Sequence, residues 1–130
     1  MAVLTAPRQR NAGHSPFAGG NLSTTQTGNA DSTNTIDRGI RADGGAVVIT
    51  STIGATPTVT VNILGSVDGV NFFNIPYSLV ATPRTFVLTA ITITTAVTTT
   101  YLLQELVPWR YIKLNYSANT NVTLTADVFV

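Results

Sequence analysis

Residues 59–75, VTVNILGSVDGVNFFNI, decide the fold. Apolar and polar residues alternate over 59–64, as they do in a strand with one buried face. Asp68 and Gly69 follow as a tight turn, and a second short strand is expected over 71–75. Alternating segments on either side of an Asp-Gly dipeptide predict a β-hairpin.

Within this hairpin, Asp68 is interpreted as a turn-forming residue at an exposed tip. Phe72 or Phe73 is expected to anchor the tip to the core. The rest of the chain shows strand patterns that would pack onto the hairpin.

Composition favours one domain with a large core and a surface poor in charge. Of 130 residues, 44% are hydrophobic and only 10% are charged, against about 25% in an ordinary soluble domain. Threonine, whose branched side chain suits a half-exposed sheet, is abundant. A surface with so little charge must avoid edge-to-edge aggregation in another way, and burial in an assembly is one.

The charge balance and the termini limit the classes of partner. The net charge is +1, and Arg8 and Arg10 with His14 form too small a basic cluster for a phosphate-binding arm, so no nucleic-acid partner is expected. There is no cysteine. The sequence does not begin with a secretory signal, and it contains no apolar run long enough to span a bilayer. These two observations predict synthesis in the cytoplasm and no membrane partner.

Strand patterns dominate from residue 35 onward, and no amphipathic helix is predicted. Turns are expected at 43–45, 54–57 and 119–121, a loop at 77–84, and a hairpin between the last two strands. About seven or eight strands at this spacing predict an all-β fold, an antiparallel β-sandwich or jelly roll. The expected strands lie at 35–41, 46–53, 58–64, 71–75, 85–94, 98–106, 109–116 and 122–130.

Residues 1–34 differ from the sandwich domain expected at 35–130. They are rich in Gly, Asn, Ser and Thr and have no strand or helix periodicity, so they cannot bury enough surface to offset their ordering entropy. Two interpretations stay open: a disordered tail, or an extended N-terminal arm that orders against a neighbouring subunit. Phe17 and Leu22 are the candidate anchors of such an arm.

No residue set predicts catalysis. His14 is the only histidine and lies in the arm, so no Ser-His-Asp arrangement can form in the core. The few carboxylates include turn formers, and none suggests the pair that a glycosidase needs. No metal and no cofactor is expected, and the protein is interpreted as non-enzymatic.

The aromatic residues leave two interpretations open. The alternation over 109–116 places Trp109, Tyr111, Lys113 and Asn115 on one face, with Trp109 partly exposed. Together with Tyr77, Trp109 and Tyr111 could form a platform for sugar rings, or they could anchor the core as aromatic residues on alternating strands commonly do.

Two segments resemble known proteins when they are taken together. GSVDGVNFFNI, residues 65–75, is similar to the hairpin of discoidin-like sandwich domains, and WRYIKLNYS, residues 109–117, is similar to a late strand of those domains. The same pair resembles a pattern in short structural proteins of tailed phages. Phe72-Phe73 stands where that pattern often has Trp, and the likeness covers about half the chain, mainly its second half.

The resemblance implies a structural protein of the virion. The short length, the absent cysteine and the N-terminal arm are more similar to a phage component than to a complete discoidin domain. The function expected is a capsid decoration or cement protein on the virion surface, which binds the major capsid protein and copies of itself, with a trimer as the default. The alternatives are a carbohydrate-binding module on a phage tail or cell surface, and a ring subunit of the tail or neck. Candidate binding residues are Arg8, Arg10, Phe17, Leu22, Asp68, Trp109 and Tyr111.

Overall fold

The protein is all-β, as the sequence predicts. The structure is a computed structural model, and it describes residues 2–5, 19–39, 44–104 and 109–129. These residues contain ten strands and no helix, and the strands form one sheet in which β1 alone lies parallel to its neighbour. The strands are β1 (Ala2–Thr5), β2 (Gly20–Gln26), β3 (Ala30–Asp31), β4 (Asn34–Asp37), β5 (Ala46–Ser66), β6 (Phe73–Asn74), β7 (Tyr77–Leu79), β8 (Ile91–Ile93), β9 (Thr98–Leu103) and β10 (Tyr111–Phe129).

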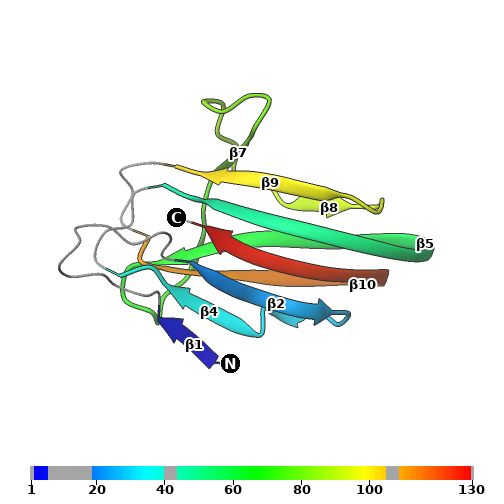
Figure 1. The fold of residues 1–130 in the computed structure, drawn as a ribbon, viewed down its shortest axis with the longest axis horizontal. Coiled ribbons are helices and arrows are strands. Elements are labelled where there is room, and N and C mark those ends of the chain that lie inside the picture. The colour runs from blue at the N-terminus through cyan, green and yellow to red at the C-terminus, as the bar shows by residue number, and fades with distance from the viewer. Residues whose placement is uncertain (1, 6–18, 40–43, 105–108, 130) are drawn as a thin grey trace.

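Two long strands organise the fold. β5 and β10 run antiparallel from the pair Ser66 and Tyr111 to the pair Ala46 and Phe129, with shifts in register only between Ser117 and Val122. At that point the two strands fold back together, and each returns along the other side of the molecule (Figure 1). The continuous sheet therefore forms two layers, which gives the sandwich-like architecture.

The fold-back depends on residues with left-handed backbone conformations. Thr56 of β5 has φ 44°, while Ala118 and Asn121 of β10 have φ 51° and 55°. This conformation turns the chain sharply and is unusual for residues with a side chain. It lets both strands change layer at the point where the register between them shifts.

Each half of the folded pair carries its own neighbours. The first half of β5 pairs with β9, and β9 pairs with β7, while β2 pairs with the second half of β10. The other half of β5 pairs with β6 and β8, while β3 and β4 pair with the first half of β10. The turn between β5 and β6 lies at one end of the molecule, opposite the fold-back (Figure 1).

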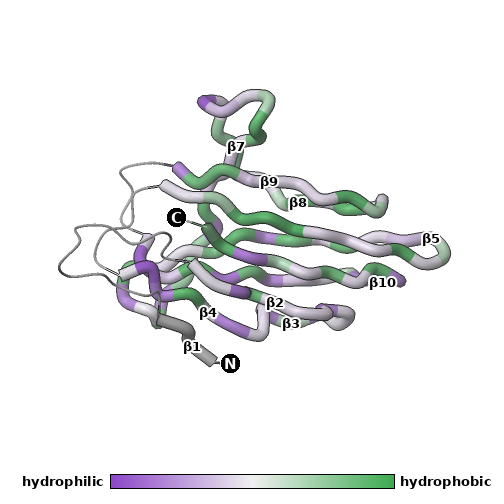
Figure 2. Tube along the Cα trace, in the orientation of Figure 1, coloured by the Kyte–Doolittle hydropathy of each residue, from purple (hydrophilic) through white to green (hydrophobic). Residues whose placement is uncertain are grey.

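The core lies between the layers and is made by alternate residues of both long strands. Figure 2 shows apolar and polar residues alternating along β10. The buried side chains of β5 and β10 face one another, and their removal from water is the main force that holds the layers together. They include Val47, Ile49, Val59, Val61, Ile63, Ile112, Leu114, Tyr116, Val122, Leu124, Ala126 and Val128.

The predicted hairpin is present, but its anchor was predicted wrongly. Leu64 pairs with Asn74 and Gly65 with Phe73, so β5 and β6 form the hairpin. Phe73 is 59% exposed and Phe72 is half-buried, whereas Ile75 is 3% exposed. Ile75 anchors the hairpin because glycine at position 65 leaves room for it: a Cβ atom there would lie 2.8 Å from Cγ2 of Ile75.

The hairpin predicted between the last two strands is absent. Residues 119–121 fold back within β10, and both halves of β10 pair with β5 rather than with each other. The turn predicted at 54–57 is likewise part of β5. The alternation of faces predicted over 109–116 is correct, because alternation depends only on local spacing.

The region between β6 and β9 also differs from expectation. A strand, β7, begins at Tyr77 where a loop was predicted, and only Ile91–Ile93 of the predicted strand 85–94 is a strand. Two hydrogen bonds between the backbones of Tyr77 and Val87 hold the connecting loop against β7. Leu88 and Ala90 are therefore exposed, while Ile91 is buried.

The boundary predicted between an arm and a sandwich at residue 34 falls inside the sheet. β2 and β3 both pair with β10, so they belong to the sandwich. Leu22, predicted to anchor an arm on a neighbour, is fully buried in the core of its own chain. Arg8, Arg10 and Phe17 lie outside the described residues.

Candidate binding surface at the hairpin tip

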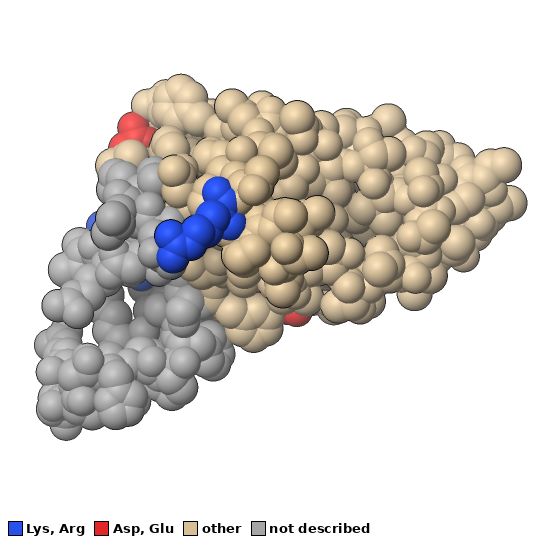
Figure 3. All heavy atoms as spheres, turned by 90° about the horizontal axis from the view of Figure 1, so that it is seen from above, with Lys and Arg blue, Asp and Glu red and all other residues tan. Residues whose placement is uncertain are grey.

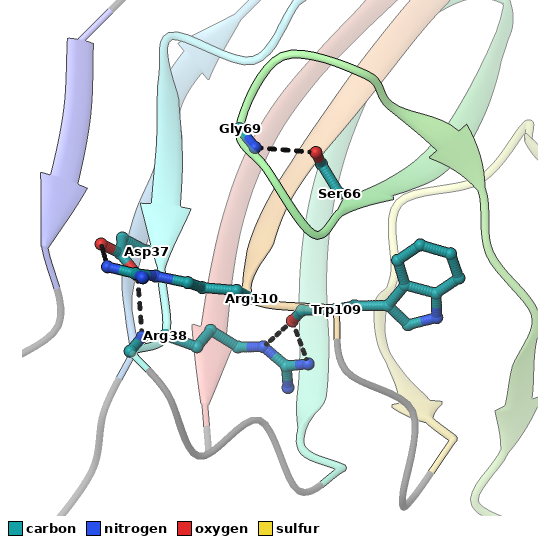
Figure 4. Close-up of polar contacts among 7 residues, drawn as sticks. Asp37, Arg38, Ser66, Gly69, Trp109 and Arg110 are labelled. Carbon is teal, nitrogen blue, oxygen red and sulfur yellow. Dashed lines mark hydrogen bonds and ion pairs between the residues drawn. The ribbon is translucent and has the colours of Figure 1, made fainter.

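The turn between β5 and β6 is fixed by one carboxylate. Oδ1 of Asp68 accepts hydrogen bonds from the backbone N–H groups of Val70 and Asn71, each at 2.8 Å, and from the Ser66 hydroxyl at 2.9 Å. Oδ2 accepts a fourth bond from the Asn71 side chain, and the Ser66 oxygen accepts the N–H of Gly69 (Figure 4). These bonds hold the pKa of Asp68 far below its ordinary value, and the bond from the Asn71 backbone has the largest effect.

The turn presents apolar side chains to solvent. Val70 is 79% exposed, and Val67 and Phe73 are also largely exposed. We define the exposed side chains of Val67, Val70 and Phe73 as the hairpin tip. Since the polar atoms of the turn bond within the turn, the hairpin tip is an apolar surface on a preorganised backbone.

Trp109 packs against the hairpin. Its indole ring packs against Gly65, where a Cβ atom would lie 3.0 Å from the ring, and the ring of Phe73 lies 6.5 Å away. Its carbonyl oxygen accepts two hydrogen bonds from the guanidinium of Arg38, at 3.0 and 2.6 Å (Figure 4). Its indole N–H is buried and has no partner among the described residues.

An ion pair fixes the next residue of β10. Arg110 donates to both carboxylate oxygens of the buried Asp37, at 2.7 and 2.9 Å (Figure 4). The bond to Asp37 is the main reason that the pKa of Arg110 is raised. The Arg110 guanidinium also lies 5.1 Å from the ring centre of Tyr111, so the pair helps to position that ring.

A shallow groove runs beside the turn. It has a volume of about 450 Å³ and is lined by Thr35, Asp68, Gly69, Val70, Phe72, Tyr111 and Lys113. The Lys113 ammonium lies 4.1 Å from the ring centre of Phe72 and 2.9 Å from Oδ2 of Asp31. Burial raises the pKa of Asp31, but hydrogen bonds from Asn115 and Lys113 and the Lys113 charge outweigh it, so that pKa is lowered.

The structure brings together three of the predicted binding residues. Asp68, Trp109 and Tyr111 all lie at or beside the hairpin tip. Of the two interpretations of Tyr77, a sugar platform and a core anchor, the structure agrees with the second, because Tyr77 is buried and packs edge-on against Tyr101 at 5.3 Å.

Sequence reasoning missed the apolar residues of the turn itself. Val67 and Val70 flank Asp68-Gly69, and this segment was interpreted only as a hairpin turn and not as an exposed apolar surface. Turns favour small and polar residues, so two valines beside such a dipeptide were a signal that could have identified an exposed apolar surface.

The carboxylates at this end have structural partners. Asp31, Asp37 and Asp68 bond to Lys113, Arg110 and the turn backbone, respectively. Across the part of the chain that the structure describes, no three His, Cys, Asp or Glu side chains group as metal ligands do, and there is no helix suited to crossing a membrane. The arrangement is suited to contact with a surface, through apolar side chains held on a fixed turn.

A second apolar surface lies on the loop between β7 and β8. Leu79, Val80, Val87 and Leu88 are exposed there, and the loop projects from the sandwich (Figures 1 and 2). Two backbone bonds within 79–85 shape it, one of them from Thr82 to Leu79. Because this loop also exposes apolar side chains, it contains the control positions for variants of the hairpin tip.

Comparisons with protein-family models, with curated proteins and with solved structures find no match to this chain. The likeness to discoidin-like and phage structural proteins therefore rests on residues 65–75 and 109–117 alone.

Proposed function

We propose that this protein is a non-enzymatic structural protein of a tailed-phage virion, a capsid decoration or cement protein that binds the shell through its hairpin tip. The two segments that carry the resemblance lie side by side, since Ser66 pairs with Tyr111 and Gly65 with Ile112. That adjacency supports the interpretation of the two segments as one unit.

The observation that carries the proposal is the exposed apolar hairpin tip. Side chains as exposed as Val70 and Phe73, grouped on one turn, are typical of surfaces that contact a partner. Because Asp68 already fixes the turn, docking would bury apolar surface without a large ordering cost.

The sparse charge of the surface supports the same proposal. The turn that presents the hairpin tip contains one charged group, Asp68, and its oxygens accept hydrogen bonds from within the turn. Docking against a shell would therefore desolvate few ionised groups. The proposed partners are the major capsid protein and copies of this chain, as a trimer, on the virion surface. Binding only the assembled shell would stabilise it by mass action.

Co-sedimentation with shells assembled without this chain tests the proposal. Wild type is expected to saturate the shells, and Val70→Asp, which puts a charge at the centre of the hairpin tip, is expected to weaken binding about 100-fold. Val80→Asp makes the same change at a valine that is 61% exposed on the other loop, and it is expected to bind as wild type does. Failure of wild type to sediment with shells would refute the proposal.

A carbohydrate-binding module is the second candidate, and the groove between Phe72 and Tyr111 favours it. The groove has the size of a sugar site and contains an ammonium group, Lys113. However, Lys113 covers the Phe72 ring and Arg110 lies over Tyr111, which leaves little aromatic surface for stacking. A glycan array decides: a specific signal that Tyr111→Ala abolishes would favour this candidate over shell binding. Particle imaging separates both from a tail or neck ring.

A further inference from the structure

The fold-back end of the sandwich has no charged side chain. We define this end by residues 24–29, 50–58, 92–98 and 117–125, which the topology gathers opposite the hairpin tip. None of these residues is Lys, Arg, Asp or Glu. In the view of Figure 3 the corresponding half of the molecule is entirely without charge, whereas charged side chains lie toward the other end.

Two apolar side chains are exposed at this end, on neighbouring segments. Ile53 is 43% exposed and Val97 is 42% exposed. The Val97 carbonyl accepts the backbone N–H of Ser51 at 2.9 Å, and the Ser51 hydroxyl bonds to the carbonyl of Thr95, so the 95–97 turn packs beside β5. A hollow of about 390 Å³ next to Ile53 is lined by Thr27, Thr52, Gly54, Asn121, Val122 and Thr123.

The polar groups at this end are of a kind that can pair with themselves. A threonine hydroxyl and an asparagine amide each contain both a donor and an acceptor, whereas an ammonium only donates and a carboxylate only accepts. Across a rotation axis each residue near the axis meets its own counterpart. A charged residue there repels its copy, but Thr52, Thr56 or Asn121 can hydrogen-bond to its own.

We propose that the fold-back end is the surface through which copies of this chain associate. Its chemistry selects a second copy of the chain, because the end combines apolar side chains, a hollow and self-complementary polar groups with no charge to attract a different partner. This inference rests on the part of the proposed function in which copies associate, and it leaves the opposite end, with its hairpin tip, free for the shell.

Sedimentation velocity of the full chain, in the absence of any particle, tests the inference. Wild type is expected at a multiple of 13.7 kDa. Ile53→Lys and Ile53→Asp are each expected to weaken association about 100-fold, since each puts like charges together across the axis. An equimolar mixture of the two variants is expected to associate again, because opposite charges then meet. Val97→Lys is a second variant, and Val80→Lys on the other loop is the matched control, expected to sediment as wild type does.

Circular dichroism shows whether each variant is folded, and folded variants alone are compared. A wild type that remains monomeric at all concentrations would overturn the inference, and so would Lys variants at 53 and 97 that associate as wild type does. Loss of association in Val80→Lys alone would assign the contact to the other loop. A monomer that still binds shells would refute this inference and the association of copies, and it would leave the proposed binding of the shell through the hairpin tip intact.

Discussion

Gly65 and Trp109 lie in direct contact, so that a Cβ atom on Gly65 would come within 3.0 Å of the indole ring. This contact joins the hairpin to the start of β10, and it involves one residue from each of the two segments that resemble phage structural proteins. It explains why a residue without a side chain stands near the end of β5, a strand rich in branched residues.

Gly65→Ala is therefore expected to destabilise the protein. The new methyl group would meet Ile75 at 2.8 Å and Trp109 at 3.0 Å, and overpacking of this kind costs about 1–3 kcal/mol of unfolding free energy. Urea denaturation measures the loss. Gly28→Ala is the control, since its Cβ would meet nothing within 4 Å; equal losses in the two variants would contradict the role of the contact.

Asp37→Asn is expected to be more damaging than Asp31→Asn. Asp37 is buried and makes two bonds to Arg110, while Asp31 is about one-third exposed and pairs with Lys113. Replacement of Asp37 disturbs a buried carboxylate that accepts two bonds from Arg110 and one from the Gly39 N–H, whereas the more exposed Asp31 pair is screened by solvent and contributes about 0.5 kcal/mol. Thermal unfolding compares the variants, and a larger loss in Asp31→Asn would contradict this ranking.

Asp68 is expected to make the protein sensitive to acid. Its folded-state pKa is lowered by the turn's hydrogen bonds, so its stabilising effect is complete above the unfolded pKa of about 4 and is lost as the pH falls below that value. Asp68→Ala should be less stable than wild type at pH 7 and should lose less stability than wild type between pH 4 and pH 2. Parallel pH profiles of the two proteins would show that the carboxylate has no such role.

Tyr116 is expected to affect stability at the alkaline end. Burial raises its pKa to about 12, although its hydrogen bond to the Ser23 hydroxyl acts in the opposite direction. The neutral phenol therefore stabilises the fold fully below the unfolded pKa of about 10, and this contribution is lost as the pH rises from there through 12. Tyr116→Phe should lose about 1 kcal/mol at pH 7, because Ser23 loses a partner, and should resist alkali better than wild type. Unfolding followed by circular dichroism at pH 7 and pH 11 checks both expectations.

The sequence predicts local features of this fold well. The inward residues of 109–116 and 122–128 and the turn role of Asp68 follow from alternation and from turn chemistry, which depend on near neighbours. The position of Ile75 was harder to predict, because Phe73 is the larger apolar residue and only the space above Gly65 decides which of the two is buried.

Features that depend on distant pairing could not be predicted. Asn119, Thr120 and Asn121 have the composition of a hairpin turn, yet β10 continues through them because β5 folds back beside it. Two interpretations of Tyr77, a surface platform and a core anchor, stayed open from the sequence, and only the pairing of β7 with β9 places it against Tyr101. The candidate site was predicted in part, since Asp68, Trp109 and Tyr111 lie at or beside the hairpin tip, while the apolar character of the tip became evident only from side-chain exposure.

The most direct test of the central claim is cryo-electron microscopy of shells saturated with the protein, at a resolution that orients the sandwich. The account predicts copies with the turn around Val70 and Phe73 against the shell and the fold-back end toward neighbouring copies. Copies bound with the turn directed into solvent, or density confined to the tail, would contradict it.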